Sequence, residues 1–200
     1  MEQASGRQGF RHRGLLERLG RSRYVQAILH DNLGAVFIRL GDAETARRHL
    51  RISQDYFEQA QSRDFLPELH RHLAAAALLD GDSTEAEAEG QRALLLAREL
   101  SMRSEEGTAL CVLGQIATAR SRLDEATERL RQGIAILGEV GDEYEEARGR
   151  LCLAQAYASQ GRRREALTAL QQCTPVFERL EAAVDLSAAH ALAEKIEDKS

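Results

Sequence analysis

A pattern that recurs every forty residues constrains the fold of this chain more than any other feature of the sequence. Four successive copies carry, without insertion or deletion, a leucine followed by a small residue: Leu33-Gly34, Leu73-Ala74, Leu113-Gly114 and Leu153-Ala154. Two more columns follow eight and thirteen positions after the leucine: Gly41, Gly81, Ser121 and Gly161, then Ala46, Ala86, Ala126 and Ala166. A fixed period between about 20 and 50 residues is typical of chains built from stacked structural units.

Each copy contains the apolar pattern of two helices. In the first half the apolar residues lie about four and seven positions apart, which predicts one buried face on a first helix, helix A. In the first copy this face is Leu29, Leu33, Val36 and Phe37. The second half repeats apolar positions three and four apart and predicts a second helix, helix B. We expect the small residue after each leucine to lie where another helix approaches closely.

Glycine and aspartate mark the turns between helix A and helix B. Gly41-Asp42 and Gly81-Asp82 stand at this point in the first two copies, and Ser121 replaces the glycine in the third. Glycine readily adopts the left-handed conformation that ends a helix, and aspartate accepts hydrogen bonds from the free N–H groups of the next helix. The sequence therefore predicts tight turns and antiparallel helix pairs.

The period also divides the chain into segments. We expect a disordered leader at 1–9, a half repeat consisting of helix B alone at 10–22, four repeats, and a capping helix at 181–198. The repeats are assigned to 23–62, 63–102, 103–142 and 143–180. The predicted fold class is all-α, a right-handed solenoid of about ten helices. Because proline interrupts helices, Thr174-Pro175 predicts a kink or a restart in the last helix B.

Composition supports a helical and soluble chain. The chain has four Tyr, five Phe and no Trp. Because aromatic residues are enriched in β-strands, this composition excludes an all-β fold. No stretch approaches the roughly 18 apolar residues of a membrane span, and the N-terminus lacks the order of a secretory signal. We therefore expect a cytoplasmic protein with no membrane partner. The net charge of −5 argues against nucleic acid as a partner, although six arginines stand within the first 23 residues.

The repeat resembles the tetratricopeptide repeat. That family shares the leucine followed by glycine or alanine, an aromatic or small residue four positions later (Phe37 and Tyr157 are aromatic here), the glycine at the turn and the alanine of helix B. The forty-residue period is similar to the long-helix variant of kinesin light chains, cell-polarity adaptors and bacterial regulators such as MalT-type activators. The resemblance implies a superhelix whose inner wall, made by helices A, binds a peptide or a partner helix.

The groove that the resemblance implies is polar at its first two copies and more apolar, with amides, at its last two. Such a wall suits a ligand with an apolar anchor and a polar or acidic end. The residues expected to contact the ligand are Asp31, Asn32, Arg39, Glu68, Arg71, His72, Gln115, Arg148 and Gln155.

No pattern in the sequence indicates catalysis or a cofactor. Cys111, Cys152 and Cys173 are odd in number and lack a CxxC spacing, so we expect reduced thiols rather than a disulfide framework or a zinc site. His70 and His72 point to different faces of one helix and are not spaced as a pair of metal ligands. A phosphate-binding loop and a catalytic triad pattern are also missing. The sequence predicts no enzyme activity, no cofactor and no metal site.

The leading hypothesis is a scaffold that binds a peptide or protein segment in the groove, as a module of a bacterial regulatory or signalling protein. Self-association is the alternative, because an unpaired helix B at the N-terminus could stack on a second copy to form a homodimer. Its apolar residues are Phe10, Leu15, Leu16 and Leu19.

Overall fold

A computed structural model of the chain describes residues 22–198. This part of the chain contains nine α-helices and no strand. The expected leader at 1–9, and the part of the expected half repeat at 10–21, lie outside the described residues. None of the described helices is long and apolar enough to cross a membrane.

The helices alternate between the two kinds that the sequence predicts. The helices A are α2 (Arg23–Arg39), α4 (Leu66–Leu79), α6 (Arg103–Ala119), α8 (Glu143–Ser159) and α10 (Ala183–Glu197). The helices B are α3 (Ala43–Ala60), α5 (Ser83–Glu99), α7 (Leu123–Val140) and α9 (Arg163–Arg179). The predicted all-α solenoid is confirmed.

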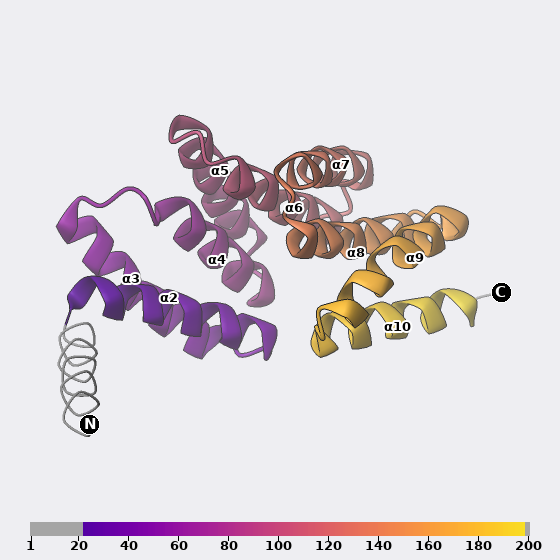
Figure 1. Ribbon diagram of the computed structural model, residues 1–200, viewed down its shortest axis with the longest axis horizontal. Coiled ribbons are helices and arrows are strands. Elements are labelled where there is room, and N and C mark those ends of the chain that lie inside the picture. The colour runs from indigo at the N-terminus through magenta and orange to yellow at the C-terminus, as the bar shows by residue number, and fades with distance from the viewer. Residues whose placement is uncertain (1–21, 199–200) are drawn as a thin grey trace, which may run out of the picture.

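The described helices form one continuous stack. Each helix packs against the next one along the chain, and each helix A also packs against the helix A of the following pair. Figure 1 shows the result, an array that turns gradually from α2 and α3 at one end to α9 and α10 at the other. The contacts between successive helices A place them side by side in an inner layer, with the helices B outside it.

Small residues allow the two helices of a pair to approach closely, as the repeat columns predict. A Cβ atom added at Gly34 would lie 2.5 Å from a side-chain carbon of Leu50, and one added at Gly114 would lie 2.5 Å from Leu130. Both leucines are fully buried. The small-residue column of helix A therefore receives the apolar column of its own helix B, which explains why both recur at the same period.

The turns have the predicted geometry. Gly41, Gly81 and Gly161 have φ angles between 73° and 86°, and Ser121 adopts the same left-handed conformation at 58°. The carboxylate of Asp42 accepts a hydrogen bond from the N–H of Thr45 at 3.0 Å. Asp82 caps α5 in the same way. These caps satisfy N–H groups that have no partner within the helix.

Two expectations about individual helices are wrong. Leu29, Leu33 and Val36 are 53%, 42% and 50% exposed rather than buried. Helix α2 is the first described helix, and among the described helices it packs against α3 and α4 alone. The predicted restart at Thr174 is also wrong, since α9 runs through Pro175 as a single helix. The Thr174 hydroxyl donates to the carbonyl of Leu170 at 2.8 Å, and buried side chains on both sides of the proline hold the helix in the stack.

Candidate functional site

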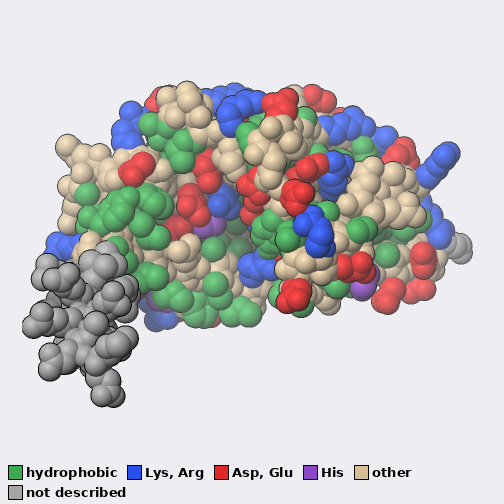
Figure 2. All heavy atoms as spheres, viewed as in Figure 1, with side chains coloured by type: hydrophobic (Ala, Val, Ile, Leu, Met, Phe, Trp, Pro, Cys, Tyr) green, Lys and Arg blue, Asp and Glu red, His purple; other side chains and the backbone are tan. Residues whose placement is uncertain are grey.

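The inner layer encloses a cavity of about 450 Å³. Side chains from four helices A line it: α2, α4, α6 and α8. Ile38, Leu78 and Val112 contribute apolar wall, while the charged wall consists of three arginines and one glutamate, with one histidine beside them. Figure 2 shows acidic, basic and histidine side chains gathered in a hollow over α4 and the neighbouring α6. The arrangement is that of a ligand pocket, mostly apolar with a few converging polar groups.

The structure brings together most of the residues that the sequence assigns to the groove. Five of them line the cavity: Arg39, Arg71, His72, Gln115 and Arg148. Asp31 is in hydrogen-bond contact with His72. A carboxylate oxygen of Glu68 lies within 4.8 Å of a ring nitrogen of His72. Asn32 is exposed and is not part of the cavity wall. Gln155 lines a separate cavity between α8 and α10.

Two of the cavity arginines differ in how firmly they are held. The Arg71 guanidinium is 3.4 Å from Glu105 and 3.7 Å from Glu68, longer than the roughly 2.7–2.9 Å of a strong charge-assisted hydrogen bond. Arg148 donates to both carboxylate oxygens of Glu145 at 3.1 Å. Arg71, whose side chain is only 13% exposed, is therefore held less tightly by its carboxylate partners than Arg148 is.

Gln115 and Cys111 of α6 line the cavity, and Gln115 also contacts Cys152 of α8. The side-chain amide of Gln115 donates to Cys152 Sγ at 2.7 Å. Burial raises the pKa of Cys152 to about 11, and burial also raises the pKa of Cys111 well above its usual range. Both thiols are therefore protonated at pH 7 and are not activated as nucleophiles. All three cysteines are free, as the sequence predicts.

A side-chain clasp joins the first described helix to the last. Arg39 at the end of α2 donates to the Tyr144 hydroxyl at 2.8 Å and pairs with Asp185 of α10 at 2.9 Å. The Tyr144 hydroxyl donates to Asp185 at 2.9 Å, and the Arg148 guanidinium lies 3.8 Å from the same carboxylate. The backbones of α2 and α10 do not pack on each other. The clasp, defined by Arg39, Tyr144 and Asp185, therefore closes the inner face by side chains alone.

Comparison with solved structures supports the helical-repeat architecture described above. No family model matches the sequence, and no curated protein matches it. Solved structures do match. A signal transduction ATPase with a tetratricopeptide repeat sensor from Pyrococcus horikoshii superposes with a TM-score of 0.63 at 15% identity, over 86% of this chain and 27% of that one. The apo form of RapI gives a TM-score of 0.61 at 14% identity, over 96% of this chain and 54% of RapI.

A putative kinesin light chain from Podosopora anserina, with nearly identical repeats, gives a TM-score of 0.60 at 16% identity over 89% of this chain and 96% of that one. This chain has a tetratricopeptide-like repeat fold. At these identities the likeness concerns the fold alone. The chain also spans only 27% and 54% of the first two proteins, so it corresponds to a part of each.

The clasp is not a property of the tetratricopeptide-like pattern, since its residues lie outside the repeated columns. We expect Arg39→Ala to lower the free energy of unfolding of α10 by about 1–2 kcal/mol, because two charge-assisted bonds to a partly exposed side chain are lost. Amide exchange in α10 should become roughly tenfold faster, as followed by hydrogen–deuterium exchange.

Arg63→Ala is the matched control for the clasp. Arg63 pairs with Glu99 on the surface, where both side chains are about half exposed, so exchange in α10 should not change. Equal exchange of α10 in the wild type and in Arg39→Ala would show that the clasp does not restrain the end of the stack.

Histidines on the tetratricopeptide-like helices A make carboxylate pairs that the sequence does not indicate. His70 Nδ1 lies 2.5 Å from a carboxylate oxygen of Glu89, and His72 Nδ1 lies 2.9 Å from Asp31 Oδ2. His72 and Asp31 are 41 residues apart in the sequence, one position more than the period. That near-match to the repeat is the one signal that could have indicated this contact, because equivalent positions on successive helices A lie side by side.

Proposed function

We propose that this chain is a non-catalytic scaffold that binds an acidic peptide or protein segment in the cavity of its inner face. The single observation that carries the proposal is the composition of the cavity wall, where three arginines and one glutamate stand among apolar side chains. A segment with an apolar anchor and an acidic group matches both parts of this wall. Groove residues on four different helices would then be engaged at once.

The size of the cavity limits what enters it. A volume of about 450 Å³ falls in the range of roughly 300–1,000 Å³ found for small-ligand pockets. It therefore accommodates the anchoring residues of a segment rather than a whole helix. Ile38 and Leu78 offer an apolar surface, and Arg71 offers a guanidinium whose present ion pairs are long.

The biological setting is part of the proposal. A signal transduction ATPase carries a repeat array of this fold as a sensor, as its name states, which supports a role for this chain as a module of a regulatory or signalling protein. We infer that this protein is bacterial. We place it in the cytoplasm, with no membrane partner and no role in binding nucleic acid.

Capture experiments with matched variants test the proposal. The groove variant Arg71→Glu/Gln115→Ala reverses one charge and removes one amide on the cavity wall. We expect wild-type protein to retain a specific partner from a cell lysate, and the groove variant to bind that purified partner at least tenfold more weakly by calorimetry.

The control variant Gln91→Ala/Arg92→Glu makes the same two changes on the exposed face of α5. Arg92 is 59% exposed, and its ion pair with Glu89 is long at 3.8 Å. The control should therefore bind the partner as the wild type does. Equal affinity of wild type and groove variant for every identified partner would exclude the cavity as the binding site.

Self-association is a second candidate, and a specific observation favours it. Leu29, Leu33, Val36 and Leu40 are 53%, 42%, 50% and 70% exposed. Their spacing of four, three and four places them on one face of α2 and of its C-cap residue, Leu40. A second copy of the chain that covers this face would bury apolar surface now in contact with water.

Light scattering distinguishes self-association from a monomeric scaffold. If the exposed face of α2 forms a dimer, the wild type should have twice the monomer mass at high concentration and Leu33→Glu should return it to the monomer. A wild type that stays monomeric at every concentration excludes this candidate.

A further inference from the structure

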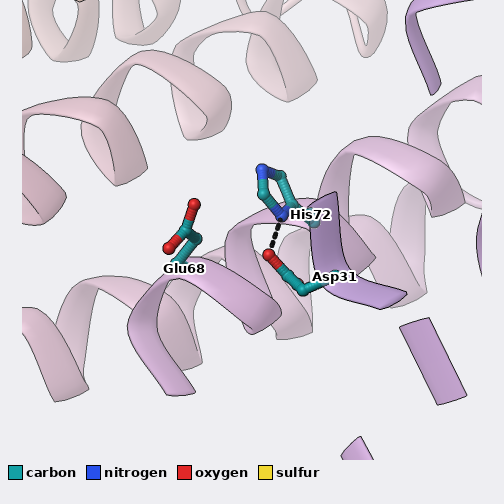
Figure 3. A group of neighbouring side chains, drawn as sticks. All are labelled: Asp31, Glu68 and His72. Carbon is teal, nitrogen blue, oxygen red and sulfur yellow. Dashed lines mark hydrogen bonds and ion pairs between the residues drawn. The ribbon is translucent and has the colours of Figure 1, made fainter. Parts of the chain in front are cut away.

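Three side chains from two neighbouring helices A converge beside the cavity. Asp31 comes from α2, and Glu68 and His72 come from α4. Figure 3 shows the hydrogen bond between Asp31 and His72, with the Glu68 carboxylate across a short gap from both. One donor atom of each residue lies within 4.8 Å of a donor atom of each of the others. Among residues 22–198 this is the one group of three potential metal ligands.

The group has unsatisfied negative charge in a buried position. Asp31 is only 3% exposed, and its Oδ1 atom is buried without a hydrogen-bond partner. The Glu68 carboxylate has only the long ion pair of 3.7 Å with Arg71. A buried carboxylate oxygen that no donor satisfies is costly, and a cation bound beside Asp31 Oδ1 would satisfy it.

We propose that Asp31, Glu68 and His72 bind a divalent transition-metal ion of the Zn²⁺ type. An imidazole nitrogen and two carboxylate oxygens are ligands that Zn²⁺ accepts, and three protein ligands leave one position for water or for a bound ligand. His72 also lines the cavity, so that fourth position lies at the cavity's edge. The site does not depend on the proposed peptide.

The change in geometry that metal binding requires is small. Tetrahedral Zn²⁺ sites with bonds of about 2.0–2.2 Å have neighbouring donors about 3.3 Å apart. The 2.9 Å between His72 Nδ1 and Asp31 Oδ2 must widen by roughly half an ångström as the ion replaces the proton between them, which is released to the solvent. The neutral imidazole then keeps its proton on Nε2 and offers the lone pair of Nδ1 to the metal.

Glu68 supplies the adjustable ligand. It lies in the first turn of α4 and its side chain is 32% exposed, so it can turn toward the ion without moving the backbone. Arg71 keeps Glu105 as its partner when Glu68 turns away. A bound ion would tie α2 to α4 and stabilise the folded state by mass action.

Calorimetry with untagged, chelator-treated protein tests the site, with Zn²⁺ alone as the titrant. The wild type should bind one Zn²⁺ per chain and show a higher melting temperature in its presence. Asp31→Asn and Glu68→Gln keep the size of each side chain and remove its charge. Each should weaken Zn²⁺ binding at least tenfold and reduce the rise in melting temperature.

Two control variants test whether the ion binds elsewhere. Glu89→Gln removes the carboxylate of the other buried histidine pair, and His49→Gln breaks the contact between the rings of His30 and His49, whose Nδ1 atoms are 2.7 Å apart. Both should bind Zn²⁺ within twofold of the wild type. If circular dichroism shows that Asp31→Asn is not folded, Glu68→Gln decides alone.

The proposal is overturned by any of three results. The first is a wild type that shows no binding of Zn²⁺ in the calorimeter. The second is a folded Glu68→Gln protein with the affinity of the wild type. The third is a loss of binding in His49→Gln or Glu89→Gln.

Discussion

Replacement of Leu113 by alanine is expected to lower the free energy of unfolding by about 2–5 kcal/mol. Leu113 is 1% exposed in the middle of the stack. Its side chain fills the space that Gly90 of α5 leaves open, since a Cβ atom added there would lie 2.8 Å from a Leu113 methyl carbon. Neither helix can move to fill the void, because each is also packed against its other neighbours. Urea denaturation followed by circular dichroism measures the loss.

Leu33→Ala is the control for this prediction, because Leu33 occupies the same repeat column. Leu33 is 42% exposed on α2, so truncation removes less buried area and leaves no enclosed void. We expect a loss below about 1 kcal/mol. A loss below about 0.5 kcal/mol for Leu113→Ala, or equal losses for the two variants, would contradict the assignment of Leu113 to the core.

The repeat columns predict local structure well because they report contacts between helices that follow each other in the sequence. The close approach of Gly34 to Leu50 recurs two repeats later, between Gly114 and Leu130. The turn at Ser121 was predicted from its place in the glycine column, and its φ of 58° confirms it. The exposure of Leu33 was not predictable from its repeat column. It depends on the contacts of α2, the first described helix, with other parts of the chain.

The candidate site was predictable only in part. Arg71, Gln115 and Arg148 were found from their places on helix A, since equivalent positions on successive helices A face the same cavity. Asp185 was not found, because it meets Arg39 across 146 residues of sequence, and that contact depends on the accumulated turn of the whole stack. A small error in the rotation between successive pairs would separate the two side chains, so no local pattern encodes them.

The proposed metal ligands were also not predictable from a local pattern in the sequence. The spacing of His70 and His72 was assessed within one helix and gave no metal site. The ligands proposed from the structure come instead from two helices, and the pairing of His72 with Asp31 depends on how α4 lies against α2. Repeats place similar positions side by side, so sequence searches for metal ligands in such folds should compare residues about one period apart.

Gly133→Ala is expected to destabilise the protein by about 1–3 kcal/mol. Gly133 lies on α7 where it meets α6, and a Cβ atom there would lie 2.6 Å from the carbonyl oxygen of Gly107 and 2.7 Å from Cys111 Sγ. Because one of these neighbours is backbone, a change of rotamer cannot relieve the overlap, and α6 and α7 must separate. The loss exceeds the roughly 1 kcal/mol that alanine gains over glycine in a helix.

Gly138→Ala on the same helix should have the opposite sign. A Cβ atom at Gly138 would meet only the carboxyl group of Glu146, at 3.5 Å or more, which is an ordinary contact. Alanine should therefore stabilise α7 by about 0.5–1 kcal/mol through its helix propensity. Thermal unfolding of the two variants separates packing from propensity, because both make the same chemical change within one helix. Equal shifts in melting temperature would mean that α6 and α7 are not in the close contact that fixes one wall of the cavity.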